Sequence, residues 1–226
     1  MTRAVLVLAV AACHVDLVPP WQLDQDRLVA VRVTPPHVAA GEVALVDALV
    51  AHAGGSTTGR TSIESPRGIT AAGAPGGLFT AVNFSIDHWE VRGPDDAGLA
   101  AARAELGLAA DAPVPVELTC VFETLIANKV IWLGDSRPNP DLPPILIDGA
   151  VPGATLDVPA GRDLQLSAVA EDVRWFSSAG TLVDDDQPTA TLHVAPEDPP
   201  SGELAVVVRD GAGGVVWQVW PITAHH

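Results

Sequence analysis

The sequence contains no tyrosine, one methionine, two cysteines and a single lysine, Lys129. Its 12 basic residues stand against 28 acidic residues, which gives a formal net charge of −16 at pH 7. Because nucleic acids and anionic lipid surfaces attract proteins through basic groups, this balance argues against both as partners. Charged residues make up only 18% of the chain and hydrophobic residues 48%, so the composition predicts a folded protein.

The apolar run at the N-terminus is too short to cross a membrane. It covers residues 4–13 and is followed by His14 and Asp16, whereas a transmembrane helix requires about 20 residues. Arg3 precedes the run and two small alanines close it, which is the three-part pattern of a secretory signal. The sequence therefore predicts an export signal at this end of the chain.

The end of this run, Val-Ala-Ala-Cys at residues 10–13, resembles a bacterial lipobox. In that family the cysteine thiol receives a diacylglyceryl group and the peptide bond before it is cleaved. The resemblance implies a lipoprotein signal peptide over 1–12, a lipidated Cys13 and a polar tether over 13–24. The alternative is an N-terminal β-strand that happens to contain Cys13.

The predicted location follows from the same resemblance. The chain would be secreted across the inner membrane and held by membrane lipid through the acylated Cys13, since more than one acyl chain makes anchoring stable. His14 rather than aspartate follows the cysteine, which by the sorting rule of some Gram-negative bacteria implies the outer membrane.

The second cysteine, Cys120, lies in the segment "VPVELTCVFE". Apolar and polar residues alternate there, which predicts a β-strand with Cys120 on its inward face. A buried structural thiol is the expected role. A reactive nucleophile is the alternative, but no neighbouring base or helix N-terminus supports it.

Glycine and proline, at 20 residues each, are spread through the chain and favour many turns. We predict a mainly β protein with two Ig-like β-sandwich domains, the first containing one inserted helix. The first domain covers 25–136, with the helix near 96–109, where Asp95 or Asp96 caps the start and Gly107 weakens the end. A proline-rich linker over 137–144 leads to the second domain, 145–226, whose short, closely spaced strands are typical of a sandwich.

Two resemblances bear on the second domain and on the whole chain. The segments "VRWFSSAGTL" and "VVVRDGAGGVVWQV" resemble bacterial immunoglobulin-like domains, which implies that Trp175 fills the centre of the sandwich. The segments "LVAVRVTPPHVAAGEVALVDALVA" and "KVIWLGDSRPNPDLPPILIDG" resemble two-domain envelope lipoproteins of myxobacteria. That second resemblance implies a surface lipoprotein without a defined activity.

The segment "WLGDSR" resembles the nucleophile motif of GDS-type esterases, in which Ser136 would attack the ester. That mechanism also requires a later Asp-x-x-His pair and a Gly-x-Asn-Asp segment, and the sequence contains neither. We therefore assign no catalytic residue and interpret Ser136 as part of a linker turn.

The sequence predicts no metal site and no other cofactor. Its histidines show no ligand spacing on one element and are expected to lie scattered on the surface. The acidic run 184–186, together with Glu171 and Asp172, contains the oxygen ligands that calcium prefers but lacks an EF-hand arrangement. A solvated turn is the favoured interpretation of that run.

The last strand, "VVWQVWPI", contains two tryptophans of opposite parity, so Trp217 and Trp220 point to opposite faces of a regular strand. We expect Trp217 in the core. Trp220 then becomes the candidate for contact with a partner, an envelope protein or a polysaccharide. Half-buried packing at a domain junction is the alternative, and the one that we favour.

The sequence as a whole predicts a lipid-anchored cell-envelope protein with a non-catalytic structural or binding role. The alternative is a periplasmic or surface hydrolase whose site is not recognisable from residue patterns. The linker prediction also implies that a protease should cut near Arg137 and leave two folded fragments.

Overall fold

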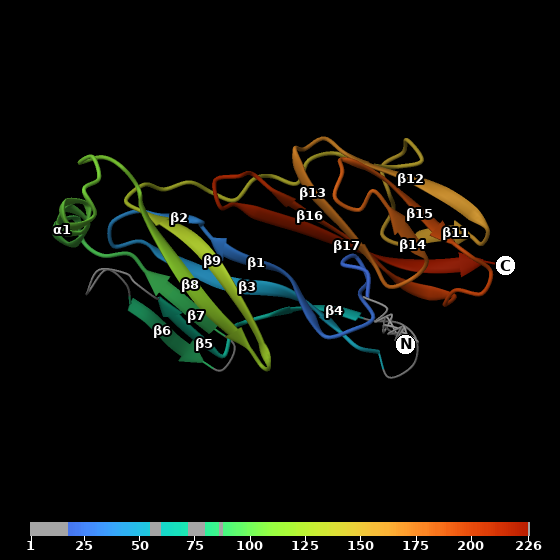
Figure 1. Cartoon of the computed structure of the whole chain (residues 1–226), viewed down its shortest axis with the longest axis horizontal. Coiled ribbons are helices and arrows are strands. Elements are labelled where there is room, and N and C mark those ends of the chain that lie inside the picture. The colour runs from blue at the N-terminus through green and yellow to red at the C-terminus, as the bar shows by residue number, and fades with distance from the viewer. Residues whose placement is uncertain (1–17, 55–59, 72–79, 86–87, 226) are drawn as a thin grey trace, which may run out of the picture.

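The computed structural model describes residues 18–54, 60–71, 80–85 and 88–225. Two β-sandwiches follow one another along the long axis of the molecule, with the helix at one end and the C-terminus near the other (Figure 1). The protein is mainly β, as the sequence predicted.

The first sandwich consists of two sheets whose strands are mostly antiparallel. One sheet has the order β1 (Arg27–Thr34), β3 (Val43–His52), β7 (His88–Arg92) and β6 (Thr80–Ser85), with β4 (Arg60–Glu64) also paired to β3. The other has the order β2 (His37–Val38), β9 (Leu125–Leu133), β8 (Val114–Phe122) and β5 (Gly68–Ala71). The inward side chains of both sheets form one hydrophobic core.

The second sandwich repeats this plan. One sheet has the order β10 (Ile145–Ile147), β12 (Arg162–Ala168), β15 (Thr189–Val194) and β14 (Thr181–Val183). The other has the order β11 (Leu156–Pro159), β17 (Val215–His225), β16 (Ser201–Arg209) and β13 (Asp172–Ser177). A separate hydrophobic core fills the space between them.

Both sandwiches have the strand order of an immunoglobulin domain. In each, the first strand pairs antiparallel within one sheet, and the next pairs parallel with the last strand of the opposite sheet, as β2 does with β9 and β11 with β17. The resulting arrangement of one A-B-E-D sheet against one sheet containing C-F-G is the immunoglobulin topology. The predicted fold class, two Ig-like sandwiches with one inserted helix, is confirmed.

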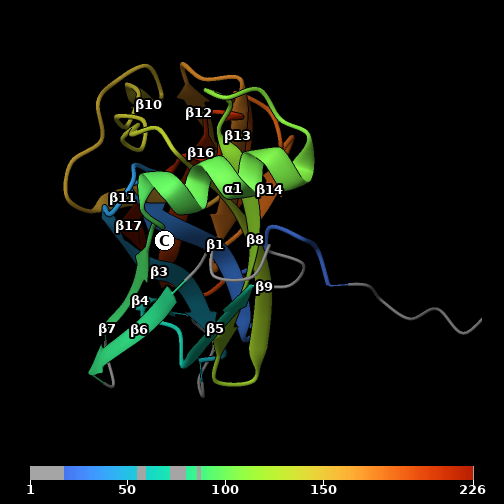
Figure 2. The same ribbon diagram turned by 90° about the vertical axis from the view of Figure 1, so that its left-hand side faces the viewer.

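The inserted helix, α1 (Asp96–Leu106), lies across the free end of the first sandwich (Figure 2). Asp95 caps its start by accepting a hydrogen bond from the Gly98 amide at 2.8 Å. The helix ends three residues before the predicted end, because Gly107 takes the left-handed conformation, with φ 66°, at its C-cap. Leu99 and Ala102 are its buried residues and pack on the core.

Several strands are apolar on both faces, which ordinary alternation does not explain. On β3, Ala48 and Val50 face the core of the first sandwich, while Leu49 and Ala51 face the other way and are also buried. On β16, Val206 faces the second core and Val207 faces outward, yet neither is exposed. A strand buried on both faces loses its polar alternation, so each sandwich must be covered on its outer face as well.

The N-terminal segment that the sequence predicted as a tether is partly attached to the second sandwich. The Leu23 amide donates to Ser177 O and the Ser177 amide donates to Trp21 O, both at 2.9 Å. Leu23 has no exposed surface. Trp21 and Leu23 are therefore part of the folded structure, unlike residues of a free tether as predicted over 13–24, and residues 13–17 lie outside the described part of the chain.

The proline-rich segment between the domains is fixed at several points. Asn139 Nδ2 donates to Val33 O at 2.9 Å, and the Val215 amide donates to Asn139 Oδ1 at 2.8 Å. Arg137 forms an isolated antiparallel bridge with His37. The segment 137–144 is thus bonded to both sandwiches, and we call it the strap. Arg137 itself is exposed.

Candidate functional site

The junction between the two sandwiches combines a buried apolar cluster with several side-chain hydrogen bonds. Its apolar part is a third hydrophobic cluster that belongs to neither core. The outer faces of β1 and β3 supply one side, and the outer faces of β13, β16 and β17 supply the other. The buried members are Leu23, Val29, Ala30, Leu49, Ala51, Phe176, Ala205, Val207 and Val215.

A bulge in β1 helps to form this surface. The pairing of β1 with β3 shifts register between Leu28 and Ala30. Such a shift changes the alternation of side chains, and the neighbouring Val29 and Ala30 both contribute to the junction cluster.

The polar part of the junction binds the tip of the β16–β17 hairpin to the first sandwich. His37 Nε2 lies 2.8 Å from Ala212 O, and Lys129 Nζ donates to Gly213 O. Asp210 stabilises the tip from within by accepting the amides of Ala212 and Gly214 at 2.9 and 2.8 Å. Carbonyl oxygens of the tip thus meet side-chain donors of the other domain.

The position of Lys129, the single lysine, lowers the pKa of its side chain. Burial and, to a smaller extent, the nearby Arg209 guanidinium lower its pKa to about 8, while Asp210 opposes the change. The ammonium group therefore retains its proton at neutral pH while lying in the junction.

Glu203 makes a second polar connection on another side of the junction. Its Oε2 accepts the Thr61 backbone amide at 2.6 Å and the Thr61 hydroxyl at 2.8 Å. Thr61 belongs to β4, at the edge of the first sandwich, so this carboxylate satisfies a backbone donor on the strand edge.

The two tryptophans of β17 do point to opposite faces, but their predicted roles are reversed. Trp220 is 1% exposed and lies in the second core, so it is not a surface residue for partner binding. Trp217 is half-buried at the junction, where the Arg32 guanidinium carbon lies 4.0 Å from the ring centroid. The favoured alternative, half-buried packing at a domain junction, holds for Trp217.

Trp175 occupies the position that the sequence predicted. Its side chain has no exposed surface, and Nε1 donates to Gln187 O at 3.1 Å. Phe176, which points to the opposite face, covers the junction, and the Arg27 guanidinium carbon lies 5.8 Å from its ring centroid.

Cys120 is fully buried in the first core, which confirms the predicted structural thiol. Burial raises its pKa to about 12, and the positive charge of Lys129 opposes this only in part. The thiol is therefore protonated and inaccessible at neutral pH, unlike a catalytic cysteine.

We expect Cys120 to resist thiol reagents in the folded protein. At about pH 8, a Cys13→Ser variant should react with an aromatic disulfide reagent only after denaturant is added, because both burial and the high pKa suppress the thiolate. The absorbance of the released thiolate measures the reaction. Equal rates with and without denaturant would show that Cys120 is accessible in the native state.

Ser136 is not part of a catalytic assembly within the described residues. Its hydroxyl lies 3.4 Å from Glu42 Oε1. The histidine beside this turn, His37, is bonded to the neighbouring Asp135 and to Ala212 O instead of to the serine. This arrangement agrees with the interpretation of Ser136 as a turn residue.

The histidine and acidic side chains that were considered as metal ligands do not come together in the structure. Across the described ranges, no group of three histidine, cysteine or acidic side chains is placed to hold a metal ion. Asp184 takes a left-handed conformation with φ 59°, and Asp185 O accepts the Trp175 amide, so this run forms a turn against β13. His37 differs from the expected surface histidines, because it is only 5% exposed.

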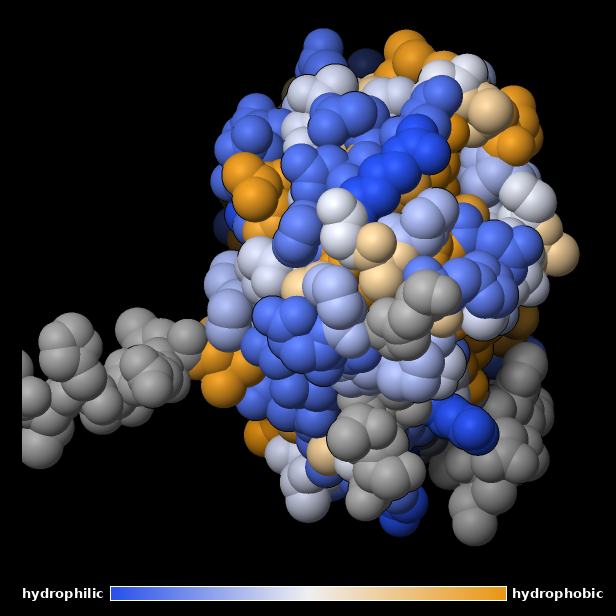
Figure 3. All heavy atoms as spheres, turned by 90° about the vertical axis from the view of Figure 1, so that its right-hand side faces the viewer, coloured by the Kyte–Doolittle hydropathy of each residue, from blue (hydrophilic) through white to orange (hydrophobic). Residues whose placement is uncertain are grey.

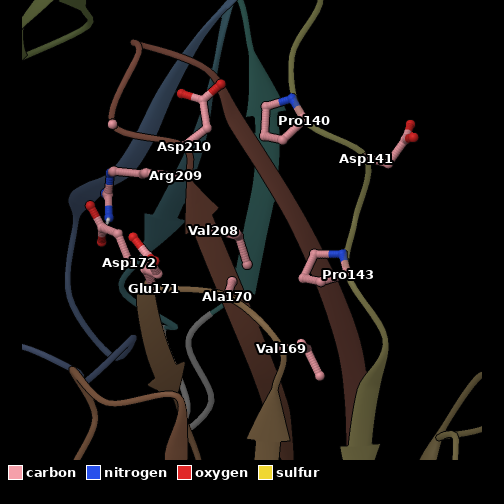
Figure 4. A pocket seen from close by; sticks show the side chains of 11 residues that line it. Pro140, Asp141, Pro143, Val169, Ala170, Glu171, Asp172, Val208, Arg209 and Asp210 are labelled. Carbon is pink, nitrogen blue, oxygen red and sulfur yellow. Dashed lines mark ion pairs between the residues drawn. The ribbon is translucent and has the colours of Figure 1, made fainter.

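Two hollows flank the junction. One, of about 380 Å³, lies between the strap and the end of the second sandwich, with Pro140 and Pro143 on one side and Ala170 and Val208 on another (Figure 4). The Arg209 guanidinium is 3.7 Å from Asp172 at its rim. The other, of about 450 Å³, lies between β4 and β17, beside Ile63 and Trp217.

Figure 3 looks onto the end of the second sandwich where the C-terminus lies. Its space-filling view is largely hydrophilic with small, separate hydrophobic areas (Figure 3). Among the helices in the described part of the chain, none has the length and apolar character needed to cross a membrane.

The sequence matches no protein-family model and no curated protein. Among solved structures, the chain is similar to tandem Ig repeats of Dlar, with 14% identity and a TM-score of 0.30, over 89% of this chain and 98% of that one. It is also similar to the IG1 and IG2 domains of DIP-gamma, with 12% identity and a TM-score of 0.27, over 90% and 99%.

A third similar structure is an endo-fucoidan hydrolase from glycoside hydrolase family 107, with 15% identity and a TM-score of 0.26 over 85% of this chain. The chain spans only 28% of that hydrolase. These likenesses are distant, and the Ig-like assignment of both sandwiches rests on their strand order.

Proposed function

We propose that the chain is a lipid-anchored cell-envelope protein with a non-catalytic, structural role, in which two Ig-like sandwiches form one unit of fixed shape. The anchor is the acylated Cys13 and the location is the outer membrane. The observation that carries the structural role is the junction cluster, because an apolar contact between the sandwiches resists their separation.

The use of aromatic side chains supports a structural role over a binding role. Surfaces that bind partners are commonly rich in tryptophan. Here Trp175 and Trp220 fill the second core, while Phe176 and Trp217 join the sandwiches. A binding role toward an envelope protein or a polysaccharide would therefore depend on other surfaces, such as the two hollows, whose linings are partly apolar.

Docking of the N-terminal segment also fits an anchored protein. Trp21 and Leu23 are bonded to β13 of the second sandwich, and Trp21 comes only eight residues after Cys13. Eight residues span at most about 29 Å when fully extended. A lipid on Cys13 would thus hold the junction close to the membrane surface instead of at the end of a long, free tether.

The anchor is tested by metabolic labelling with a fatty-acid probe in a bacterial host that processes lipoproteins. The native chain should be labelled and recovered in the membrane fraction, and Cys13→Ser should abolish both results. Cys120→Ala is the matched control, because it removes the other cysteine and should leave the label unchanged. Equal labelling of the native chain and of Cys13→Ser would contradict the proposed anchor.

The fixed junction is tested by cleavage in the strap. A recognition sequence for a specific protease, inserted after the exposed Arg137, should be cleaved, and the two fragments should then elute together from a size-exclusion column in native buffer. The apolar cluster and the hairpin contacts hold them without the covalent link. Separate elution of two folded fragments would show that the sandwiches are independent units joined by a linker.

A further inference from the structure

We propose that the hollow between the strap and the second sandwich binds an arginine side chain of a partner protein. This hollow, which we call the strap hollow, has a volume of about 380 Å³. It is lined by residues of the strap, of the turn from β12 to β13 and of the β16–β17 hairpin. The inference goes beyond the structural role proposed above and does not depend on the lipid anchor.

One part of the strap hollow is apolar. Pro140 and Pro143 form the side that belongs to the strap, and the side chains of Val169, Ala170 and Val208 lie across from them (Figure 4). Val169 is 76% exposed, although the neighbouring Val208 is only 3% exposed. A ligand that covers Val169 removes apolar surface from water, which is favourable. The hollow therefore favours a ligand that has an apolar segment.

The other part of the strap hollow has an excess of negative charge. Glu171 and Asp172 stand on the side away from the strap, and Asp210 stands at one end (Figure 4). The Asp141 side chain points out of the hollow. Arg209 is the single basic residue of the lining, and its guanidinium lies 3.7 Å from Asp172. The carboxylates of Glu171 and Asp210 therefore have no balancing charge within the lining.

These two carboxylates differ in how free they are to bind a ligand. Asp210 Oδ1 already accepts the amides of Ala212 and Gly214, which fixes this side chain at the hairpin tip. Glu171 is exposed, and its carboxylate makes no hydrogen bond or ion pair with another residue in the described part of the chain. Glu171 is therefore the acceptor that is available to a cation, and Asp210 adds its negative charge from a fixed position.

The separation of apolar and charged parts selects the kind of ligand. A metal ion has no apolar segment, and a polyamine carries charges at both ends of its apolar chain, whereas the apolar part of the hollow has no second charged group. Arginine and lysine side chains combine an apolar stem with one charged head. The guanidinium of arginine is more weakly hydrated than an ammonium group and forms two parallel hydrogen bonds with a carboxylate. Arginine is therefore the side chain that fits best.

The charge of the whole chain favours a basic protein as the source of this arginine. The formal net charge of −16 attracts basic proteins and accelerates their encounter with the chain, and salt screens this attraction. A second copy of the chain has the same negative charge and is repelled. A basic segment with a protruding arginine thus fits both the strap hollow and the overall charge.

The test is a titration followed by nitrogen-15 NMR. The full chain with Cys13→Ser is used, so that no lipid is attached, and the probe is the capped peptide acetyl-Gly-Arg-Gly-amide. This peptide should shift the backbone amides of Val169, Ala170 and Gly211, with a dissociation constant on the order of 1 mM, because a single side chain covers little surface. The same peptide with citrulline has a similar shape without the charge and should bind about three-fold more weakly or less. Equal binding of the two peptides would overturn the proposal.

Two substitutions locate the binding site. Glu171→Gln should weaken binding of the arginine peptide by about three-fold or more, because it removes the available carboxylate. Val169→Thr keeps the shape of the side chain but makes the apolar wall polar, and should weaken binding by about two-fold. Both side chains are exposed, so both variants should fold.

Glu197→Gln is the matched control. Glu197 is exposed and follows the end of β15 that pairs with Arg162, whereas the hollow lies beyond the opposite end of β12. This variant should bind the arginine peptide like the unsubstituted chain. If Glu171→Gln and Glu197→Gln bind the peptide equally well, the proposed site is wrong.

The same amides also report other occupants of the hollow. Spermidine that shifts them at lower concentration than the arginine peptide would identify a polyamine as the ligand. Shifts that appear when the chain is concentrated without peptide would identify a second copy as the occupant. Either outcome would overturn the assignment of the strap hollow to an arginine of a partner protein.

Discussion

Val207→Asp is expected to separate the two sandwiches without unfolding the second one. Val207 has no exposed surface and faces the junction cluster, away from the second core. An aspartate there would place a carboxylate among apolar side chains, at a cost of several kcal/mol. The protein can avoid this cost by opening the junction to water.

We expect the native chain to unfold in one cooperative transition and Val207→Asp to unfold in two. Calorimetry measures the number of transitions. Two transitions should appear because the cores of the sandwiches are separate, and only the junction couples them. Val183→Asp is the matched control, since Val183 lies on β14 of the same sandwich and is 54% exposed. If Val207→Asp unfolds in the same single transition as Val183→Asp and the native chain, the coupling of the domains does not depend on the burial of Val207.

Trp175→Ala is expected to destabilise the second sandwich by about 3–5 kcal/mol, the usual cost of removing a large aromatic side chain from a packed core. This is comparable to the total stability of many domains, about 5–15 kcal/mol, so the sandwich should melt at a much lower temperature or fail to fold. The loss includes the hydrogen bond from Nε1 to Gln187 O.

Trp175→Phe and Ser136→Ala are the variants with which the loss of stability in Trp175→Ala is compared. Phenylalanine retains most of the packing and should cost less than alanine, while Ser136 is exposed and its replacement should leave the stability unchanged. Far-UV circular dichroism during thermal unfolding measures all three. A Trp175→Ala variant that melts like Ser136→Ala would contradict the assignment of Trp175 to the core.

Local patterns identified the elements because their physical causes are local. Alternation along "VPVELTC" placed Cys120 on the inward face of a strand, and the inward face is buried in the structure. Asp95 and Gly107 bound the helix because an N-cap acceptor and a left-handed C-cap act within one turn. The parity of β17 correctly placed its two tryptophans on opposite faces.

The roles of particular residues depend on contacts with residues that are far away in the sequence. Parity separates Trp217 from Trp220 but does not tell which face meets the core of the same domain, and that choice was predicted the wrong way round. His37 has no recognisable pattern around it, because its partner Ala212 is 175 positions away. The apolar character of both faces of β3 and β16 is a signal from which the covering of their outer sides could have been predicted.

The sequence by itself determined the mainly β class, the division into two sandwiches, the helix and the interior positions of Cys120 and Trp175, since hydrophobic periodicity and capping act over neighbouring residues. Tertiary structure decided that Trp21 and Leu23 dock on the second sandwich, that the proline-rich segment is a strap, and that Trp217 joins the sandwiches. These outcomes depend on which two surfaces meet, and surfaces meet through contacts between residues that are far apart in the chain.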